Sequence, residues 1–209
     1  MQNQIPYGIF VNEMKPKSTK QYIIEKTAPI FNKKGFTGTY LSDLTEATGL
    51  TKGSIYCNFK DKNEVAVEAF RHNLKQLNKK VNNKINKLKR ADEKLLVLLN
   101  HYKNNYKQVF KNGGCAILNT SVDSDDGNEL LKNEAVKALN SWKSTTEKII
   151  IEGIKNGELK PIDPEKYSCK FIALIEGSIM LSKTLNEPLY LIHNIEYLEE
   201  EVKSLTIKK

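Results

Sequence analysis

Apolar residues recur at helical spacing along most of the 209-residue chain. They stand three or four positions apart over 23–31, 65–88 and 95–110, and again in the second half of the chain, which is the period of amphipathic helices. Alternating apolar and polar runs, which are typical of strands, do not stand out. The pattern predicts an all-α fold, with long helices over 62–88, 129–156 and 165–185 and a last helix from Pro188 to about Leu205.

Two short helices joined by a tight turn are predicted within residues 35–59. Leu41 and Leu44 share one face of the first helix, and Gly49 supplies the left-handed backbone that ends it sharply. Thr51 is a good N-cap for the second helix, which carries Ile55 on its buried side. This is a helix-turn-helix pattern, in which the second helix lies in the major groove of DNA. The outward face of that helix is small and polar: Lys52, Gly53, Ser54, Tyr56 and Cys57.

A series of motif residues surrounds this pair of helices: Phe31, Gly35-Phe36, Thr39, Asp43-Leu44, the run ATGL at 47–50, the run KGSIY at 52–56, Phe59, Lys62 and Glu64. In this order, over about 19–70, they resemble the N-terminal DNA-binding domain of the TetR family of bacterial repressors. The sequence departs from the family at Tyr40, where Ser or Thr is usual, at Thr45, where a small Ala is usual, and at Asn58, where His or Tyr is common.

The resemblance implies a homodimeric, cytoplasmic transcriptional repressor that binds a palindromic operator in double-stranded DNA and is released by an unknown small-molecule effector. It implies an N-terminal extension over 1–16, a helix-turn-helix DNA-binding domain over 17–62, and a helical effector-binding and dimerisation domain over 63–209. The residues expected at DNA are Thr39, Tyr40, Thr51, Lys52, Gly53, Ser54, Tyr56, Asn58 and Lys62. Within this set, Thr39, Tyr40 and Lys62 are expected to hold phosphates. Lys62 stands beside a helix N-terminus, so its side chain and the backbone amides there can approach one phosphate together.

Aromatic residues on several helices of the second half of the chain are candidates for an apolar pocket with a few polar groups. The expected lining is Leu99, Tyr102, Tyr106, Phe110, Cys115, Asn119, Trp142, Phe171 and Ile175. Each aromatic residue taken alone is equally explained as filling of the core. Cys115 lies in a short motif that resembles a subgroup with electrophile and oxidant sensors, so oxidation or alkylation of Cys115 is an alternative signal, provided that the thiol is accessible and its pKa is low.

The dimer is expected to form through the helices over 129–156 and 165–185, which would pair with their symmetry mates around a two-fold axis. Small residues let helix backbones approach closely, so a tight crossing is expected at Gly177. The residues expected at this interface are Ile172, Gly177, Ser178 and Leu181.

Charge is divided unequally along a chain whose formal net charge is +8. Residues 1–90 carry 17 lysines and arginines against 7 acids, whereas residues 91–209 carry 16 against 18. The basic half contains the helix-turn-helix, which predicts a polyanionic partner for that half. Eight of the basic residues lie between Arg71 and Arg90, without an acid. This stretch is either a flank that reaches toward phosphates or a solvated helix face, and a surface for a membrane or a partner protein is a further reading.

Catalytic and metal-binding signatures are missing from the sequence. The three histidines are scattered, and no metal-binding, nucleophile or phosphate-loop motif is present. The three cysteines form no CxxC pair, which indicates reduced thiols in a cytoplasm. The acidic run over 123–126 lacks the spacing of a calcium loop. We therefore expect no enzyme activity, no cofactor, no metal and no membrane span; the alternative function is a DNA-binding protein that needs no effector.

Overall fold

The computed structural model describes residues 18–208, apart from the side chain of Lys80. The expected N-terminal extension over 1–16 lies outside these residues. Within 18–208 the chain forms nine α-helices and no strand, so the all-α prediction is confirmed. The helices are α1 (Thr19–Lys34), α2 (Leu41–Thr48), α3 (Lys52–Tyr56), α4 (Lys62–Ile85), α5 (Ala91–Lys111), α6 (Ala116–Ser124), α7 (Glu129–Lys155), α8 (Pro164–Thr184) and α9 (Leu189–Leu205).

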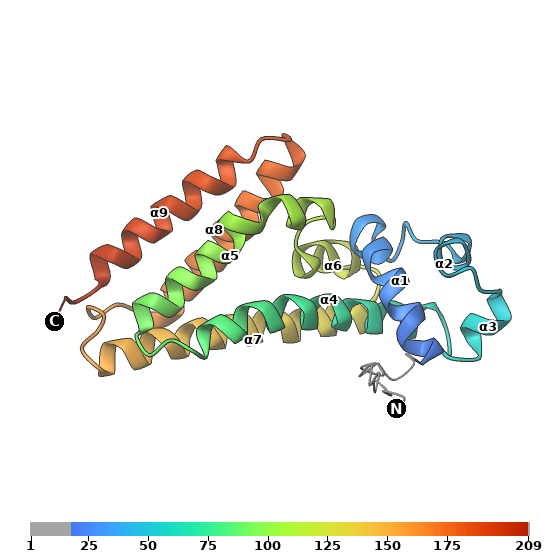
Figure 1. Ribbon diagram of the computed structural model, residues 1–209, viewed down its shortest axis with the longest axis horizontal. Helices are drawn as coiled ribbons and strands as arrows, with labels where there is room; N and C mark the ends of the chain where they lie inside the picture. The colour runs from blue at the N-terminus through green and yellow to red at the C-terminus, as the bar shows by residue number, and fades with distance from the viewer. Residues whose placement is uncertain (1–17, 209) are drawn as a thin grey trace, which may run out of the picture.

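Helices α1 to α3 gather at one end of the molecule, and we call them the head (Figure 1). Helices α4 to α9 form the rest, which we call the body. Helix α4 begins at the head and runs along α7 toward the far end, and α5 returns toward the head. Helix α6 lies between the end of α5 and the head. The body therefore contacts the head through α4, α6 and the loop that precedes α6.

The ends of the short helices follow from local chemistry. The Thr51 hydroxyl accepts a hydrogen bond from the Ser54 amide (3.2 Å) and caps α3, while Gly49 ends α2 with a left-handed φ of 68°. The Asp61 carboxylate caps α4 by accepting from the Glu64 amide (2.9 Å), and the Glu64 carboxylate accepts from the Lys60 amide (2.7 Å). Each side chain satisfies an amide that lacks a partner within its helix. The predicted helix-turn-helix is thus present.

A continuous apolar core joins the head to the body. Ile23, Leu44 and Ile55 are fully buried in the head, and Leu99 and Phe171 are fully buried in the body. Helix α1 packs along the first half of α4. Because the two parts share one packed core, a displacement on one side is transmitted to the other rather than absorbed at a flexible joint.

The basic stretch over 71–90 lies mainly on α4, which leads away from the recognition helix α3 (Figure 1). Its first member, Arg71, forms a double hydrogen bond with the Glu134 carboxylate of α7 (2.8 and 3.0 Å) and a third with Glu68 (2.8 Å). The Arg71 guanidinium lowers the pKa of Glu134 to about 2. Lys75, Lys79 and Lys84 are exposed. Of the two readings of this stretch, the arrangement favours a solvated helix face, which Arg71 holds to α7, over a flank that reaches toward phosphates.

Candidate functional site

The outer surface of the head is formed by the start of α3. Thr51, Lys52, Gly53 and Ser54 are all exposed. A Cβ added at Gly53 would meet only the Thr51 hydroxyl, at 3.9 Å, so nothing within the described chain requires a glycine there. A residue without a side chain on an open surface allows a second molecule to approach the backbone closely.

The remaining residues expected at DNA differ in accessibility. Tyr56 is half-buried against the core, and the Asn58 amide donates to the Ser54 carbonyl (2.9 Å). Tyr40 is 68% exposed at the start of α2. Thr39 is fully buried and its hydroxyl donates to the Gly35 carbonyl (2.5 Å), so the expected phosphate contact by this side chain is wrong. The hydroxyl is used to close the turn between α1 and α2.

Lys62 has a role within the head. Its ammonium group donates to the Phe36 carbonyl (2.6 Å) and lies 4.1 Å from the centre of the Phe36 ring. Burial lowers the pKa of Lys62, and the Asp123 carboxylate acts in the opposite direction. A phosphate contact by Lys62 stays a prediction. Lys60, which sequence reasoning missed, is exposed immediately after the recognition helix.

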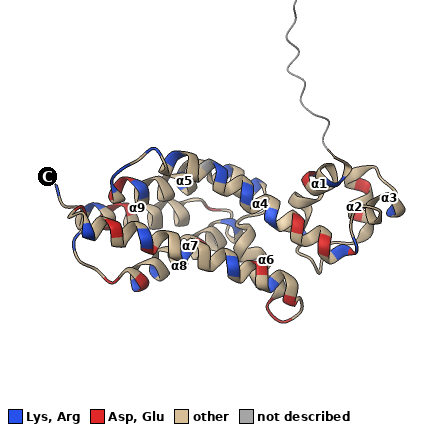
Figure 2. Cartoon of the chain, turned by 90° about the horizontal axis from the view of Figure 1, so that it is seen from below, with Lys and Arg blue, Asp and Glu red and all other residues tan. Residues whose placement is uncertain are grey.

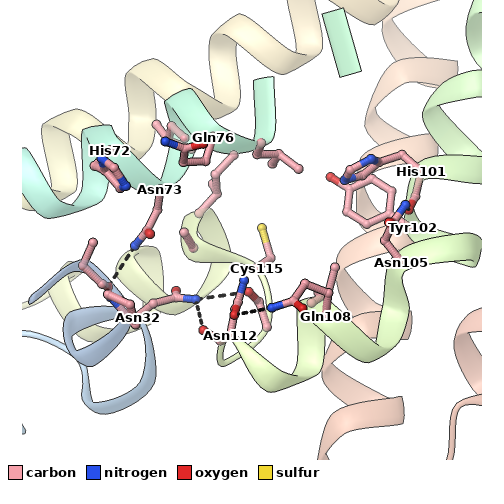
Figure 3. A pocket seen from close by; sticks show the side chains of 18 of the residues that line it. Asn32, His72, Asn73, Gln76, His101, Tyr102, Asn105, Gln108, Asn112 and Cys115 are labelled. Atoms are coloured by element: carbon pink, nitrogen blue, oxygen red, sulfur yellow. Dashed lines mark hydrogen bonds between the residues drawn. The ribbon is translucent and has the colours of Figure 1, made fainter. Parts of the chain in front are cut away.

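A cavity of about 270 Å³ lies behind the head, enclosed by α1, α4, α5 and the start of α6 (Figure 3). Apolar side chains, among them Leu74, Leu77 and Val109, make up the larger part of its surface, and amide side chains from α1, α4 and α5 stand between them. The labelled polar residues around this space are Asn32, His72, Asn73, Gln76, His101, Tyr102, Asn105, Gln108, Asn112 and Cys115. The space therefore offers apolar surface together with groups that can hydrogen-bond to whatever fills it, and its role as the expected effector pocket stays a prediction.

Of the nine residues expected to line a pocket, Tyr102 and Cys115 do so. Leu99, Phe171 and Ile175 are fully buried in the core. Trp142 stacks on Tyr102 with ring centres 6.1 Å apart, and the Tyr106 and Phe110 rings contact each other edge to face at 5.7 Å. Asn119 holds the end of α1 and does not line the cavity. The prediction failed because aromatic side chains at helical spacing packed on one another and on the core.

The sequence did contain a signal for the cavity. His101, Asn105, Gln108 and Asn112 recur at spacings of four, three and four, which places a polar stripe on one face of α5. On α4, His72, Asn73 and Gln76 form a second polar group opposite. Together with Leu74, Leu77 and Val109, these polar side chains surround a space of mixed character, which can hold water or a ligand.

A buried carboxyl group lies beside the cavity residue Cys115. Glu176 of α8 is 8% exposed, and neither of its carboxyl oxygens has a hydrogen-bond partner within the described chain. Burial raises the pKa of Glu176 to about 7, with a smaller opposing effect of the Cys115 thiol. Burial also raises the pKa of Cys115 well above its usual value, and Glu176 raises it further. A buried thiol with a raised pKa is a poor nucleophile, which disfavours the alternative signal by oxidation or alkylation.

Hydrogen bonds connect the wall of the cavity to the head. The Asn32 amide of α1 donates to the carbonyls of Asn112 (2.6 Å) and Gly114 (3.3 Å). The Asn119 amide of α6 donates to the carbonyls of Asn32 (2.8 Å) and Gly113 (2.9 Å). Gly113 has a φ of 102°, and a Cβ there would meet the Asn32 carbonyl oxygen at 3.0 Å. The loop between α5 and α6 therefore fits closely around the end of α1.

One turn after Asn119, α6 makes a second contact with the head. The Asp123 carboxylate accepts hydrogen bonds from the backbone amides of Phe36 (2.5 Å) and Thr37 (3.4 Å). In Figure 2 the loop that follows α6 is coloured red, which marks acidic residues. The first carboxylate of the acidic run over 123–126 is thus bound to the head.

The described residues contain no group of histidine, cysteine and acidic side chains that could hold a metal ion. None of the described helices combines the length and the apolar character that crossing a bilayer requires.

Two family models match the chain. The model described as bacterial regulatory proteins, tetR family, matches residues 23–69, and the tetracyclin repressor-like C-terminal domain matches residues 91–198. The chain is 24% identical to the HTH-type transcriptional repressor DhaR of Mycobacterium sp. strain GP1, over 78% of this chain and 82% of that protein. It is 24% identical to the fatty acid metabolism regulator protein of Bacillus subtilis, over 70% and 74%. A TetR-family regulator structure from Cytophaga hutchinsonii superposes with a TM-score of 0.85 at 40% identity, over 93% of this chain and all of that one.

Replacing Glu176 with Gln should change how stability depends on pH. The folded chain binds the Glu176 proton more tightly than the unfolded chain, whose pKa is near 4.5, so this group makes the chain less stable as pH rises from 4.5 to about 7. Glu176→Gln removes this loss of stability. The free energy of unfolding of the variant minus that of the unchanged chain should therefore be larger at about pH 8 than at about pH 5, by up to about 3 kcal/mol. Urea unfolding at equal protein concentration measures it, and an equal difference at both pH values would contradict the burial argument.

Proposed function

This chain belongs to the TetR family of bacterial regulatory proteins, and from that premise we propose that it is a repressor which leaves its operator when a small molecule occupies the cavity. As a family member it is a DNA-binding transcriptional regulator. The observation that carries the proposal of release is the position of Asn32, which lines the cavity and also belongs to the first helix of the head. A ligand in the cavity contacts the element that orients the DNA-binding surface.

The proposed DNA surface is the exposed start of α3 together with Tyr40 and Lys60. Lys52, Gly53 and Ser54 would face base edges in the major groove, and Thr51 would lie beside the backbone. Tyr40 and Lys60 flank α3 on the chain and are exposed, as phosphate contacts require. The excess of basic residues over 1–90 supports a polyanionic partner for this end.

We propose a homodimer that is held together by α8 and α9 of each protomer, in place of the expected four-helix interface in which 129–156 and 165–185 pair with their symmetry mates. Helix α7 is used within the chain, because it packs against α4, α5, α6 and α8. Ser178 is 2% exposed and its hydroxyl donates to the Leu174 carbonyl, so its side chain faces the chain's own core and does not form part of the interface. Large apolar side chains that stay exposed in this part of the chain are Met180, Leu181, Leu185, Leu189, Tyr190 and Tyr197. Covering such a surface is a common reason for helical chains to associate.

The proposed release follows from linkage between ligand and DNA. A ligand lowers operator affinity only if it binds better to a conformation in which the two recognition helices are wrongly spaced. Half-sites lie one helical turn of DNA apart, about 34–36 Å, so a small rotation of each head prevents both from docking. Helix α4 carries His72 and Asn73 at the cavity, and the Asn73 amide donates to the Ala28 carbonyl of α1 (3.0 Å). Helix α6 reaches the head through Asn119 and Asp123, so the cavity is linked to the head along two routes.

The DNA surface is tested by the salt dependence of binding. In Lys60→Ala, each protomer loses one phosphate contact, so the slope of log affinity against log salt should become shallower by about 1.8 for the dimer. Fluorescence anisotropy with an operator fragment selected from the genome of the source organism measures the slope. Lys160→Ala, an exposed lysine at the far end of the body, is the matched control and should leave the slope unchanged. Equal slopes in the two variants would remove Lys60 from the DNA surface.

The α6 contact is tested by Asp123→Ala. The backbone amides of Phe36 and Thr37 lose their acceptor, so both should exchange with solvent faster, which hydrogen exchange measures without knowledge of the effector. Operator affinity without effector should fall by about 5–150-fold, the range of typical allosteric coupling. The control is Asp125→Ala, which removes an exposed carboxylate from the next turn of the chain. Exchange and affinity that match the control would show that α6 does not orient the head.

The dimer is tested by Gly177→Leu. No atom lies within 4 Å of a Cβ added at Gly177, so the single chain has room for the new side chain. A bulky residue there should weaken the dimer and, with it, operator binding, because both half-sites must be occupied together. The control is Gly127→Leu, which adds the same side chain to the loop after α6, where a Cβ also has no atom within 4 Å; it should leave the dimer unchanged. Light scattering over a dilution series gives the result, and a monomeric unchanged chain would overturn the dimer.

A further inference from the structure

We propose that the cavity takes a small organic cation, such as a primary amine, whose charge is balanced by the Glu176 carboxylate next to Cys115 and Tyr102. This inference rests on the proposed function, because it gives the chemical class of the effector for the same cavity. It assigns Glu176, which does not line the cavity itself but lies against the lining residue Cys115, as the counter-ion of the ligand.

The charges around the cavity favour a cation. Among the described residues that line it there is no lysine and no arginine, whereas Glu25 contributes a carboxylate. Lys183, two turns after Glu176 on α8, is hydrogen-bonded to the Gly113 carbonyl and does not line the cavity. An anionic ligand would therefore depend on the imidazoles of His72 and His101 for positive charge, whereas a cation meets the Glu25 carboxylate in the lining and has Glu176 behind Cys115.

Glu176 is a carboxyl group without the partners that burial demands. Both oxygens are buried and lack a hydrogen-bond partner within the described chain. The titratable groups that act on it or are acted on by it are Cys115, at the start of α6, and Tyr102 of α5; no lysine or arginine contributes. A buried ionised carboxylate costs several kcal/mol unless an opposite charge compensates it. A cation in the adjacent cavity would supply that charge.

The lining suits the polar part of such a ligand. Side-chain oxygens of Asn73, Asn105 and Gln108 can accept hydrogen bonds from an ammonium group, directly or through water. Tyr102, stacked on Trp142, adds an aromatic surface of the kind that attracts cations. A volume of about 270 Å³ equals the share of about nine waters in the liquid, which fits a molecule of modest size. The apolar side chains of Leu74, Leu77 and Val109 suit the hydrocarbon part of such a ligand.

The test uses three probes of one shape on the full-length chain: benzylamine as the cation, benzyl alcohol as the neutral analogue and benzoate as the anion. Calorimetry should show that benzylamine binds more tightly than the other two. Its affinity should rise from about pH 5.5 to about pH 8, because Glu176 must lose its proton to act as counter-ion. In Glu176→Gln, affinity for benzylamine should fall tenfold or more and its dependence on pH should flatten. Glu200→Gln, an exposed glutamate of α9, should change neither.

The outcomes separate this inference from the proposed function. Benzoate or benzyl alcohol binding as tightly as benzylamine, no benzylamine binding at millimolar concentration, or an affinity that Glu176→Gln leaves unchanged would each overturn the cation site. Operator DNA is then added to the same samples. Benzylamine that binds through Glu176 and leaves operator affinity unchanged would uphold the cation site and overturn the cavity as the effector site.

Discussion

The hydrogen bonds between the end of α1 and the loop before α6 fix the position of the head. Asn32 is buried, so its amide and its backbone carbonyl both need partners inside the protein. The carbonyls of Asn112 and Gly114 receive the amide, and Asn119 satisfies the carbonyl. The geometry depends on left-handed backbone at Gly113 and Gly114. Because the same segment forms one wall of the cavity, the position of the DNA-binding surface and the shape of the cavity cannot be changed independently.

The head could be predicted from the sequence because its structure is specified locally. Thr51 and Asp61 cap helices that begin at the next residue, and Gly49 ends α2 where the pattern of apolar residues ends. Such signals act over three or four residues and are legible in the chain itself. The sequence did not show which polar side chains of the head are engaged in hydrogen bonds within the head. Thr39 and Lys62 are bound by carbonyls of the neighbouring turn, and only the folded backbone reveals those carbonyls.

The cavity was harder to predict because it is a property of how helices meet. The period of α5 correctly placed Leu99 and Tyr102 toward the interior, but two inward positions can either pack together or leave a gap. The polar stripe of α5 that begins at His101 lines the cavity, whereas most of the aromatic residues that were expected to line it pack on one another or in the core. Glu176 lies far along the chain from Cys115, so no spacing rule joins them. Their proximity, which changes the pKa of both, exists only after α8 has packed against the rest of the body.

The contacts that orient the head also have a consequence for synthesis of the chain on the ribosome. Asn32 and Asn119 are 87 positions apart, as are Phe36 and Asp123. The N-terminal part of a chain leaves the ribosome first and can fold before the rest exists. The nascent head therefore has its own caps and core and can pack on α4 as that helix emerges, but it lacks the hydrogen bonds of Asn119 and Asp123 until α6 has emerged. A nascent chain stalled before Asp123 would hold its recognition helix through α4 alone, so the second support of the head is added only after translation has passed α6.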